Sequence, residues 1–163
     1  MSHTAIEVRP LGESEREWSS AFLHAEWGTA GVARRGELVD PTPLPGFVAV
    51  VEGGRAGLAT YAVRGDECEL VTIDSLREGI GVGRALLDAV RDAAVAAGCR
   101  LLWLVTTNNN LRALELYQRW GMELVAFRRD AVAEARKTLK PSIPEHAANG
   151  IPIKDELELE LLL

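Results

Sequence analysis

Hydrophobic residues follow a helical period in four segments of the chain. The first segment begins after Ser14 and Glu17, which have the spacing of a capping box. Its apolar positions are Trp18, Ala21, Phe22 and Ala25. The second helix ends at Gly98, and its apolar positions are Leu86, Leu87, Val90, Ala93, Ala94 and Ala97. Two further helices are predicted over residues 111–120, between Asn110 as N-cap and Gly121, and over residues 131–139.

Alternating or continuously apolar segments between the helices predict strands. The expected strands cover residues 6–9, 47–51, 57–63, 68–73, 100–106, 122–127 and 156–161. Turns at residues 52–54 and 65–66 indicate an antiparallel meander. In the last strand glutamate and leucine alternate, which predicts a half-buried strand. The strands on either side of the second helix imply a parallel pair with a right-handed crossover, so we predict an α/β domain with a mixed sheet.

Composition limits what kind of protein this is. The chain has 163 residues, 47% of them hydrophobic, which suits one domain over residues 1–163. A formal net charge of −6, with no more than short basic pairs such as Arg34-Arg35 and Arg128-Arg129, argues against a nucleic-acid partner. No segment has the pattern of a targeting signal or the length of a membrane span, so we expect a cytoplasmic protein with no membrane partner.

Cysteine and histidine residues give no pattern of a metal site. Cys68 and Cys99 lie in apolar segments, where buried free thiols are expected, and the three histidines, His3, His24 and His146, are scattered. We therefore expect no metal.

Glycines at every second position open the second helix. Gly79, Gly81 and Gly83 allow a ligand to approach the backbone, and a helix start offers unpaired N–H groups, so the loop is a candidate phosphate or pyrophosphate site. A dinucleotide-binding fingerprint needs a third glycine at Arg84 or Leu86, and the P-loop lysine and hydroxyl are also absent. A turn that only connects a strand to a helix is the alternative.

Two segments together resemble the GNAT superfamily of acetyl-CoA-dependent N-acetyltransferases. One is the glycine segment from Gly81 to Leu87, and the other, from Asn110 to Gly121, resembles the family's Asn-x-x-Ala-x-x-x-Tyr-x-x-x-Gly element. The resemblance implies a mixed, mostly antiparallel sheet with a central, splayed parallel strand pair flanked by helices. It also implies acetyl-CoA as cosubstrate.

The resemblance assigns roles to particular residues. Pyrophosphate is expected on the backbone amides of Gly79, Ile80, Gly81, Val82, Gly83 and Arg84. Glu78 stands where the family has arginine or glutamine, and Arg77 and Arg84 could supply the missing charge. Backbone groups around Val71 and Ile73 would hold the pantetheine and thioester. The second motif contributes Asn110, Ala113 and Tyr117, with Tyr117 as the acid that protonates the departing thiolate.

A base is also needed, because the amine must lose a proton. Strict alternation would put Glu67 and Glu69 on the strand face that carries Val71 and Ile73. We favour Glu69, acting through a water, if partial burial raises its pKa. Glu67 as the base, deprotonation by water alone, and a salt-bridged Glu69 without a chemical role stay open.

The two irregular connections, residues 27–45 and 141–152, are expected to converge on the acceptor side of the cofactor. Apolar surface would come from Trp27, Phe47, Ile143 and Ile151. Arg34 and Arg35 could pair with a substrate carboxylate or simply solvate a surface turn. We therefore expect transfer of an acetyl group to the primary amine of a small molecule that also bears an acidic or apolar group. A catalytically silent acyl-CoA sensor is the alternative function, and a homodimer is left open.

Overall fold

The computed structural model describes residues 4–163, and its centre is a seven-stranded sheet with the strand order β1-β4-β5-β6-β7-β9-β8. Neighbouring strands are antiparallel except β6 and β7, which are parallel. The strands of this sheet are β1 (Ile6–Pro10), β4 (Gly46–Val51), β5 (Gly54–Arg64), β6 (Glu67–Ser75), β7 (Leu101–Thr107), β8 (Glu123–Arg128) and β9 (Glu156–Leu162). The predicted mixed sheet with a central parallel pair is confirmed.

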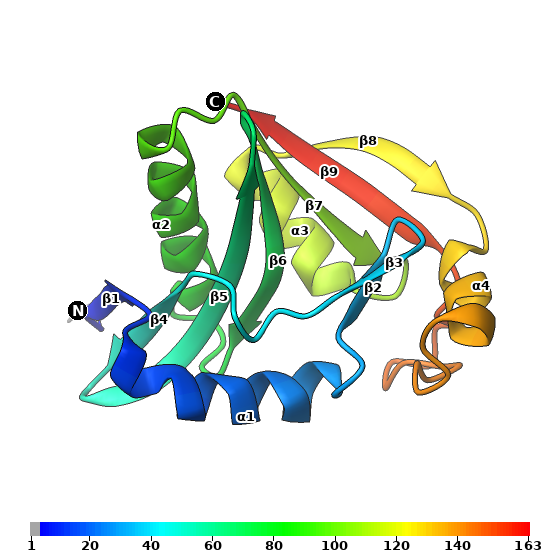
Figure 1. Cartoon of the computed structure of the whole chain (residues 1–163), viewed down its shortest axis with the longest axis horizontal. Helices are drawn as coiled ribbons and strands as arrows, with labels where there is room; N and C mark the ends of the chain where they lie inside the picture. Colours follow the sequence, from blue (N-terminus) through cyan, green and yellow to red (C-terminus); the bar gives the residue numbers. More distant parts are fainter. Residues whose placement is uncertain (1–3) are drawn as a thin grey trace.

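Helices cover both faces of the sheet (Figure 1). The helices are α1 (Arg16–Trp27), α2 (Val82–Ala96), α3 (Leu111–Trp120) and α4 (Ala131–Thr138). The largest core cluster lies under α2 and α3, while α1 packs a second cluster, around Leu23, Val48 and Leu58, on the opposite face. Helix α2 buries the predicted side, with Leu86, Leu87 and Val90 fully covered.

The start of α1 differs from the prediction. Ser14 lies in a short 3₁₀ turn, Glu13–Glu15, and no side chain caps the helix, so the predicted capping box is wrong. The helix begins later because Glu15 is buried and pairs with Arg9 and Arg55 instead of remaining in a solvated loop.

The first irregular connection contains a hairpin that the sequence pattern does not reveal. Its strands are β2 (Val32–Arg34) and β3 (Glu37–Val39), and each is too short to show a period. The two turn residues have positive φ, 51° at Arg35 and 75° at Gly36, which is the geometry of a two-residue hairpin turn. The hairpin places Arg34 and Arg35 on the sheet face that also carries α1.

The last strand is more buried than its alternation predicts. β9 is an inner strand, with β7 on one side and the edge strand β8 on the other. Its Glu156 and Glu158 are buried along with Leu159. The glutamates are covered because Arg35 and Arg128 pair with them. One face of β9 is therefore an internal ion-pair surface instead of a solvent-facing one.

Among residues 4–163, no helix is long and apolar enough to cross a membrane. Within the same residues no group of three or more His, Cys, Asp or Glu side chains could hold a metal ion. Cys68 and Cys99 are buried free cysteines, as expected. His3 lies outside the described residues.

Candidate active site

The parallel strands β6 and β7 pair only at their beginning and then separate. Their paired residues are Glu67 to Glu69 with Leu101 to Trp103, although β6 continues to Ser75 and β7 to Thr107. A cleft of about 730 Å³ opens beyond this point. It is lined by the diverging strands, the glycine loop and α3. The backbone edges that face the cleft are not used in pairing between these two strands.

Most of the site residues predicted from the sequence come together along this cleft. Its lining includes Glu69, Val71, Ile73, Glu78, Gly79, Gly81, Val82, Gly83, Arg84, Asn110, Ala113 and Tyr117. Ile80 is the exception, because its side chain packs against the main core cluster. Glu67 lines a neighbouring pocket instead of the cleft.

The glycine loop presents the start of α2 to one end of the cleft. Gly81 adopts a left-handed conformation, with φ of 95°, immediately before Val82, the first helical residue. The amide of Ala85 donates to the carbonyl of Gly81 at 3.0 Å, so the three amides from Val82 to Arg84 precede the first helical hydrogen bond. These amides and the positive end of the helix dipole suit a pyrophosphate.

Tyr117 lies on the other wall of the cleft, on α3. Its side chain is 5% exposed. Burial and the nearby charge of Asp74 both raise the pKa of Tyr117. The phenol therefore stays protonated near neutral pH and has a proton to donate. Asn110 sits just before α3 without capping it, and its Nδ2 instead donates to Oγ1 of Thr106 at 3.3 Å.

A β-bulge interrupts the side-chain alternation that the sequence predicts along β6. Thr60 of β5 pairs with Thr72, but Tyr61 pairs with Leu70, which leaves Val71 as the extra residue. Val71 packs with Val32 on the hairpin side, whereas Ile73 packs against the cluster under α2 and α3. The prediction that Val71 and Ile73 share one face is therefore wrong.

The bulge turns Asp74 toward α1, and sequence reasoning missed this residue. Asp74 lines the cleft, and its Oδ2 accepts a hydrogen bond from Nε1 of Trp27 at 2.8 Å. Burial raises the pKa of Asp74 to about 6 despite that hydrogen bond. A carboxylate with this pKa is suited to accept a proton near neutral pH.

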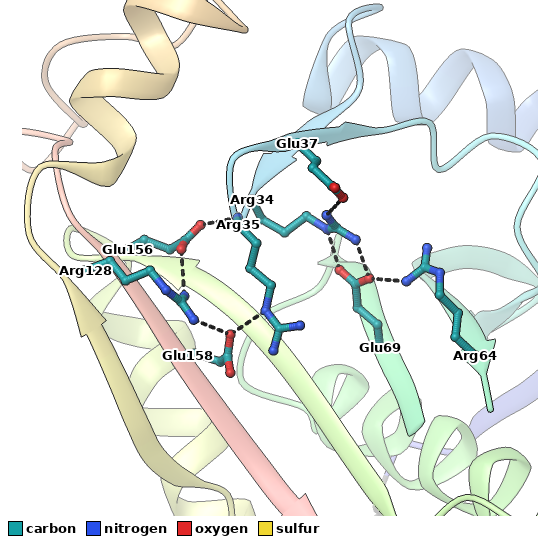
Figure 2. Close-up of polar contacts among 8 residues, drawn as sticks. All are labelled: Arg34, Arg35, Glu37, Arg64, Glu69, Arg128, Glu156 and Glu158. Atoms are coloured by element: carbon teal, nitrogen blue, oxygen red, sulfur yellow. Dashed lines mark hydrogen bonds and ion pairs between the residues drawn. The ribbon is translucent and has the colours of Figure 1, made fainter. Parts of the chain in front are cut away.

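Glu69 is held by two arginines, as Figure 2 shows. Arg34 donates to both carboxylate oxygens at 2.8 Å, and Arg64 donates to Oε1 at 2.9 Å. The Glu69 side chain is only 2% exposed. A carboxylate whose two oxygens already accept charge-assisted hydrogen bonds has little capacity left to take a proton, so this geometry argues against Glu69 as the base.

Three residues expected to contact the acceptor, Arg34, Phe47 and Ile151, have other contacts in the structure. Arg34 is occupied by Glu69 and Glu37, so it is not free for a substrate carboxylate. Phe47 stacks on Tyr61, with ring centroids 5.8 Å apart, and lies away from the cleft. Ile151 belongs to a turn in which its amide donates to Asn149.

The predicted convergence of the two connections does occur at Ile143. A side pocket of about 130 Å³ is lined by Ile143 together with Trp27 and Val32. Lys140, which also lines this pocket, holds its wall in position: its Nζ donates to the carbonyl of Gly31 at 2.6 Å and to the carbonyl of Trp27. Burial lowers the pKa of this lysine.

Comparison with known proteins identifies the family. The sequence profile described as Acetyltransferase (GNAT) family matches residues 12–122. This chain belongs to the GNAT acetyltransferase family. The YdhI protein of Bacillus subtilis (strain 168) is 40% identical over 151 residues, which cover 92% of this chain and 94% of YdhI.

Solved GNAT structures share the fold. The IAA acetyltransferase from Bacillus cereus ATCC 14579 superposes with a TM-score of 0.75 at 20% identity, over 98% of this chain and 100% of that one. A GNAT acetyltransferase from Elizabethkingia anophelis, solved with acetyl-CoA bound, has a TM-score of 0.69 at 17% identity, over 97% and 98% of the two chains.

A pair of glycines with matched geometry can test the loop of this GNAT domain. Gly79 and Gly98 have φ of 80° and 81°, and no atom lies within 4 Å of a Cβ added at either. Alanine at each should therefore cost similar stability, on the order of 1 kcal/mol. We expect Gly79→Ala alone to weaken CoA binding, roughly tenfold, because it would shift the amides that are expected to bind the pyrophosphate. Isothermal titration calorimetry with CoA measures this difference, and equal affinities in both variants would exclude the loop from the site.

Glu78 gives a second test of the same end of the cleft. Its carboxylate pairs with Arg112, and both side chains line the cleft. Glu78→Gln should tighten CoA binding about two- to fivefold, since it removes a negative charge and releases Arg112, and exposed charge pairs contribute about 0.2–1 kcal/mol. The gain should shrink at high salt. Calorimetry at two ionic strengths checks both statements, and an unchanged affinity would mean that Glu78 does not face the phosphates.

Proposed function

We propose that this GNAT protein transfers the acetyl group of acetyl-CoA to the primary amine of a small molecule by direct attack. The observation that carries the proposal is one continuous cleft, with helix-start amides at one end and a protonated, buried tyrosine on its wall. Family membership supports acetyl-CoA as cosubstrate.

The cosubstrate would lie between the diverging strands. Its pyrophosphate would bind the amides at the start of α2, and its pantetheine arm would replace β7 as the hydrogen-bonding partner of the free edge of β6 near Val71 and Ile73. Asn110 and Ala113 would line the opposite wall. This arrangement brings the thioester to the point where β6 and β7 separate.

The chemical step needs three proton transfers. One proton of the ammonium passes through a water to Asp74, whose pKa of about 6 suits a base near neutral pH, and from there to solvent. The amine nitrogen then forms a bond to the thioester carbonyl carbon, and the carbon–sulfur bond breaks. Tyr117 gives its proton to the departing thiolate, and the second proton that the nitrogen loses as the amide forms restores the phenol. Glu69 takes no proton in this scheme, because Arg34 and Arg64 occupy both of its oxygens.

The acceptor side favours a small molecule over a protein tail. Lys140, just after α4, joins that segment to the connection before β2 by donating to the carbonyl of Gly31, and the side pocket between these segments has a volume of only about 130 Å³. The apolar walls, from Trp27, Val32 and Ile143, suit a compact substituent on the amine.

The test is thiol release from acetyl-CoA with a panel of amino acids, arylalkylamines, polyamines and aminoglycosides, with the acetylated product identified by mass spectrometry. The proposal requires amine-dependent thiol release with at least one small amine. Tight CoA binding without turnover on the whole panel would support an acyl-CoA sensor instead. A clear preference for polyamines or aminoglycosides would contradict the acceptor class.

A further inference from the structure

Arg35 holds an unusual backbone position next to the cleft. It is a non-glycine residue with φ of 51°, in a turn where asparagine or glycine is favoured. Its guanidinium nevertheless stacks on Trp103, with its carbon 3.6 Å from the ring centroid. Strained backbone positions of this kind are concentrated at functional sites, which makes Arg35 a candidate functional residue.

The turn is fixed in place by the buried glutamates of β9. The backbone amide of Arg35 donates to Oε1 of Glu156 at 2.8 Å, and its Nε donates to Oε1 of Glu158 at 2.7 Å. Within residues 4–163 neither Nη atom of Arg35 has a hydrogen-bond partner. Figure 2 shows this guanidinium between Glu158 and Glu69, with its hydrogen bond to Glu158 drawn as a dashed line.

The ion pairs around the turn leave two arginines with N–H groups to spare. Four guanidinium groups, those of Arg34, Arg35, Arg64 and Arg128, are joined to four carboxylates, those of Glu37, Glu69, Glu156 and Glu158. Arg34 is occupied by Glu69 and Glu37. Arg35 uses only its Nε, on Glu158, and Arg64 uses one Nη, on Glu69, so both can still donate to a bound anion.

There is room for such a group beside the transfer cleft. A pocket of about 480 Å³ is lined by Arg35, Arg64 and Trp103, and it shares Arg34 and Glu69 with the cleft. Trp103 pairs with Glu69, two residues before Val71 on β6. The ring on which Arg35 stacks therefore lies beside the part of β6 that leads into the cleft, where the thioester is proposed to lie.

We propose that Arg35, assisted by Arg64, binds a carboxylate of the acceptor, so that the substrate is an α- or β-amino acid. The inference rests on the proposed acetyl transfer and names its substrate class. A planar carboxylate fits the two free nitrogens of one guanidinium. Arg34 takes no direct part, because Glu69 occupies it.

The experiment compares each amino acid with the amine that remains when its carboxylate is removed. The pairs are leucine with 3-methylbutylamine, phenylalanine with phenethylamine, and β-alanine with ethylamine. Arg35→Asn removes the guanidinium but keeps a residue that tolerates the left-handed turn. We expect it to lower the ratio of kcat/KM for the acid over that for the amine roughly 10- to 100-fold, mainly through KM of the acid. Arg35→Lys should give an intermediate ratio.

Arg129→Asn is the matched control, because this arginine is exposed and pairs only with its neighbour Asp130 among residues 4–163. It should leave the ratio as in the wild type. A wild-type enzyme that acetylates amines with no preference for carboxylates, or a preference that Arg35→Asn does not change, would overturn this inference and leave the proposed function standing. Absence of turnover on every probe would instead remove the proposed function.

Discussion

Replacing Tyr117 by phenylalanine is expected to lower kcat by roughly 10²- to 10⁴-fold, the usual contribution of a general acid. The phenol lies buried on the cleft wall, and because its pKa is raised it is protonated near neutral pH, as a proton donor to the thiolate must be. The affinity for CoA should change little, because the ring and its packing remain. Steady-state kinetics, with calorimetry for CoA, separates the two effects.

The chain offers a matched control in Tyr61, its other tyrosine. Burial raises the pKa of Tyr61 as well, but this side chain stacks on Phe47 and does not line the cleft. Tyr61→Phe should therefore keep the wild-type kcat. If Tyr117→Phe turns over at the wild-type rate, a water or another residue protonates the thiolate. If both variants lose activity alike, the effect is one of packing.

The cofactor side of the cleft could be predicted because its signals are local in sequence. The glycines at residues 79, 81 and 83 and the spacing from Asn110 to Gly121 each describe one turn or one helix face. Such features depend on φ preferences and helical periodicity, which a short segment determines by itself. The parallel pair followed from a strand, a helix and a strand in succession. The position of the cleft could therefore be predicted without knowing which residues make contacts that are distant in sequence.

The acceptor side depends on features that no short segment reveals. The bulge at Val71 arises from the register between β5 and β6, and it alone changes which face Asp74 occupies. The partners of Arg34 and Arg35, Glu69 and Glu158, are 35 and 123 residues away in sequence. Alternation along a single strand therefore selected Glu69 as the base, although its position beside two arginines makes it a poor one.

Asp74→Asn should change both the rate and its pH dependence. In the wild type, kcat/KM should rise with pH through a midpoint of about 6, because Asp74 accepts the ammonium proton only when it is ionised. Without that carboxylate the enzyme must capture the neutral amine, so the midpoint should move toward the pKa of the amine itself, about 10. At neutral pH the expected loss of kcat/KM is on the order of 10²-fold or more.

Stability gives an independent readout for the same variant. Because burial raises the pKa of Asp74 in the folded protein, its carboxylate destabilises the native state progressively as pH rises from its unfolded pKa, about 4, through about 6. Asparagine keeps an oxygen for the Trp27 hydrogen bond without that charge. Asp74→Asn should therefore be at least as stable as the wild type at pH 7 in urea denaturation. Lower activity with undiminished stability separates a catalytic role from a structural one.

Glu69→Gln is the comparison that decides between the two carboxylates. It leaves the buried Arg34 with only the exposed Glu37 as a charged partner, so it should lose stability, up to about 3–5 kcal/mol for a broken buried pair. Its pH profile should keep the midpoint near 6, because Asp74 is untouched. If the midpoint moves in Glu69→Gln and stays in Asp74→Asn, the base is Glu69, and the ion pairs with Arg34 and Arg64 must open during the reaction.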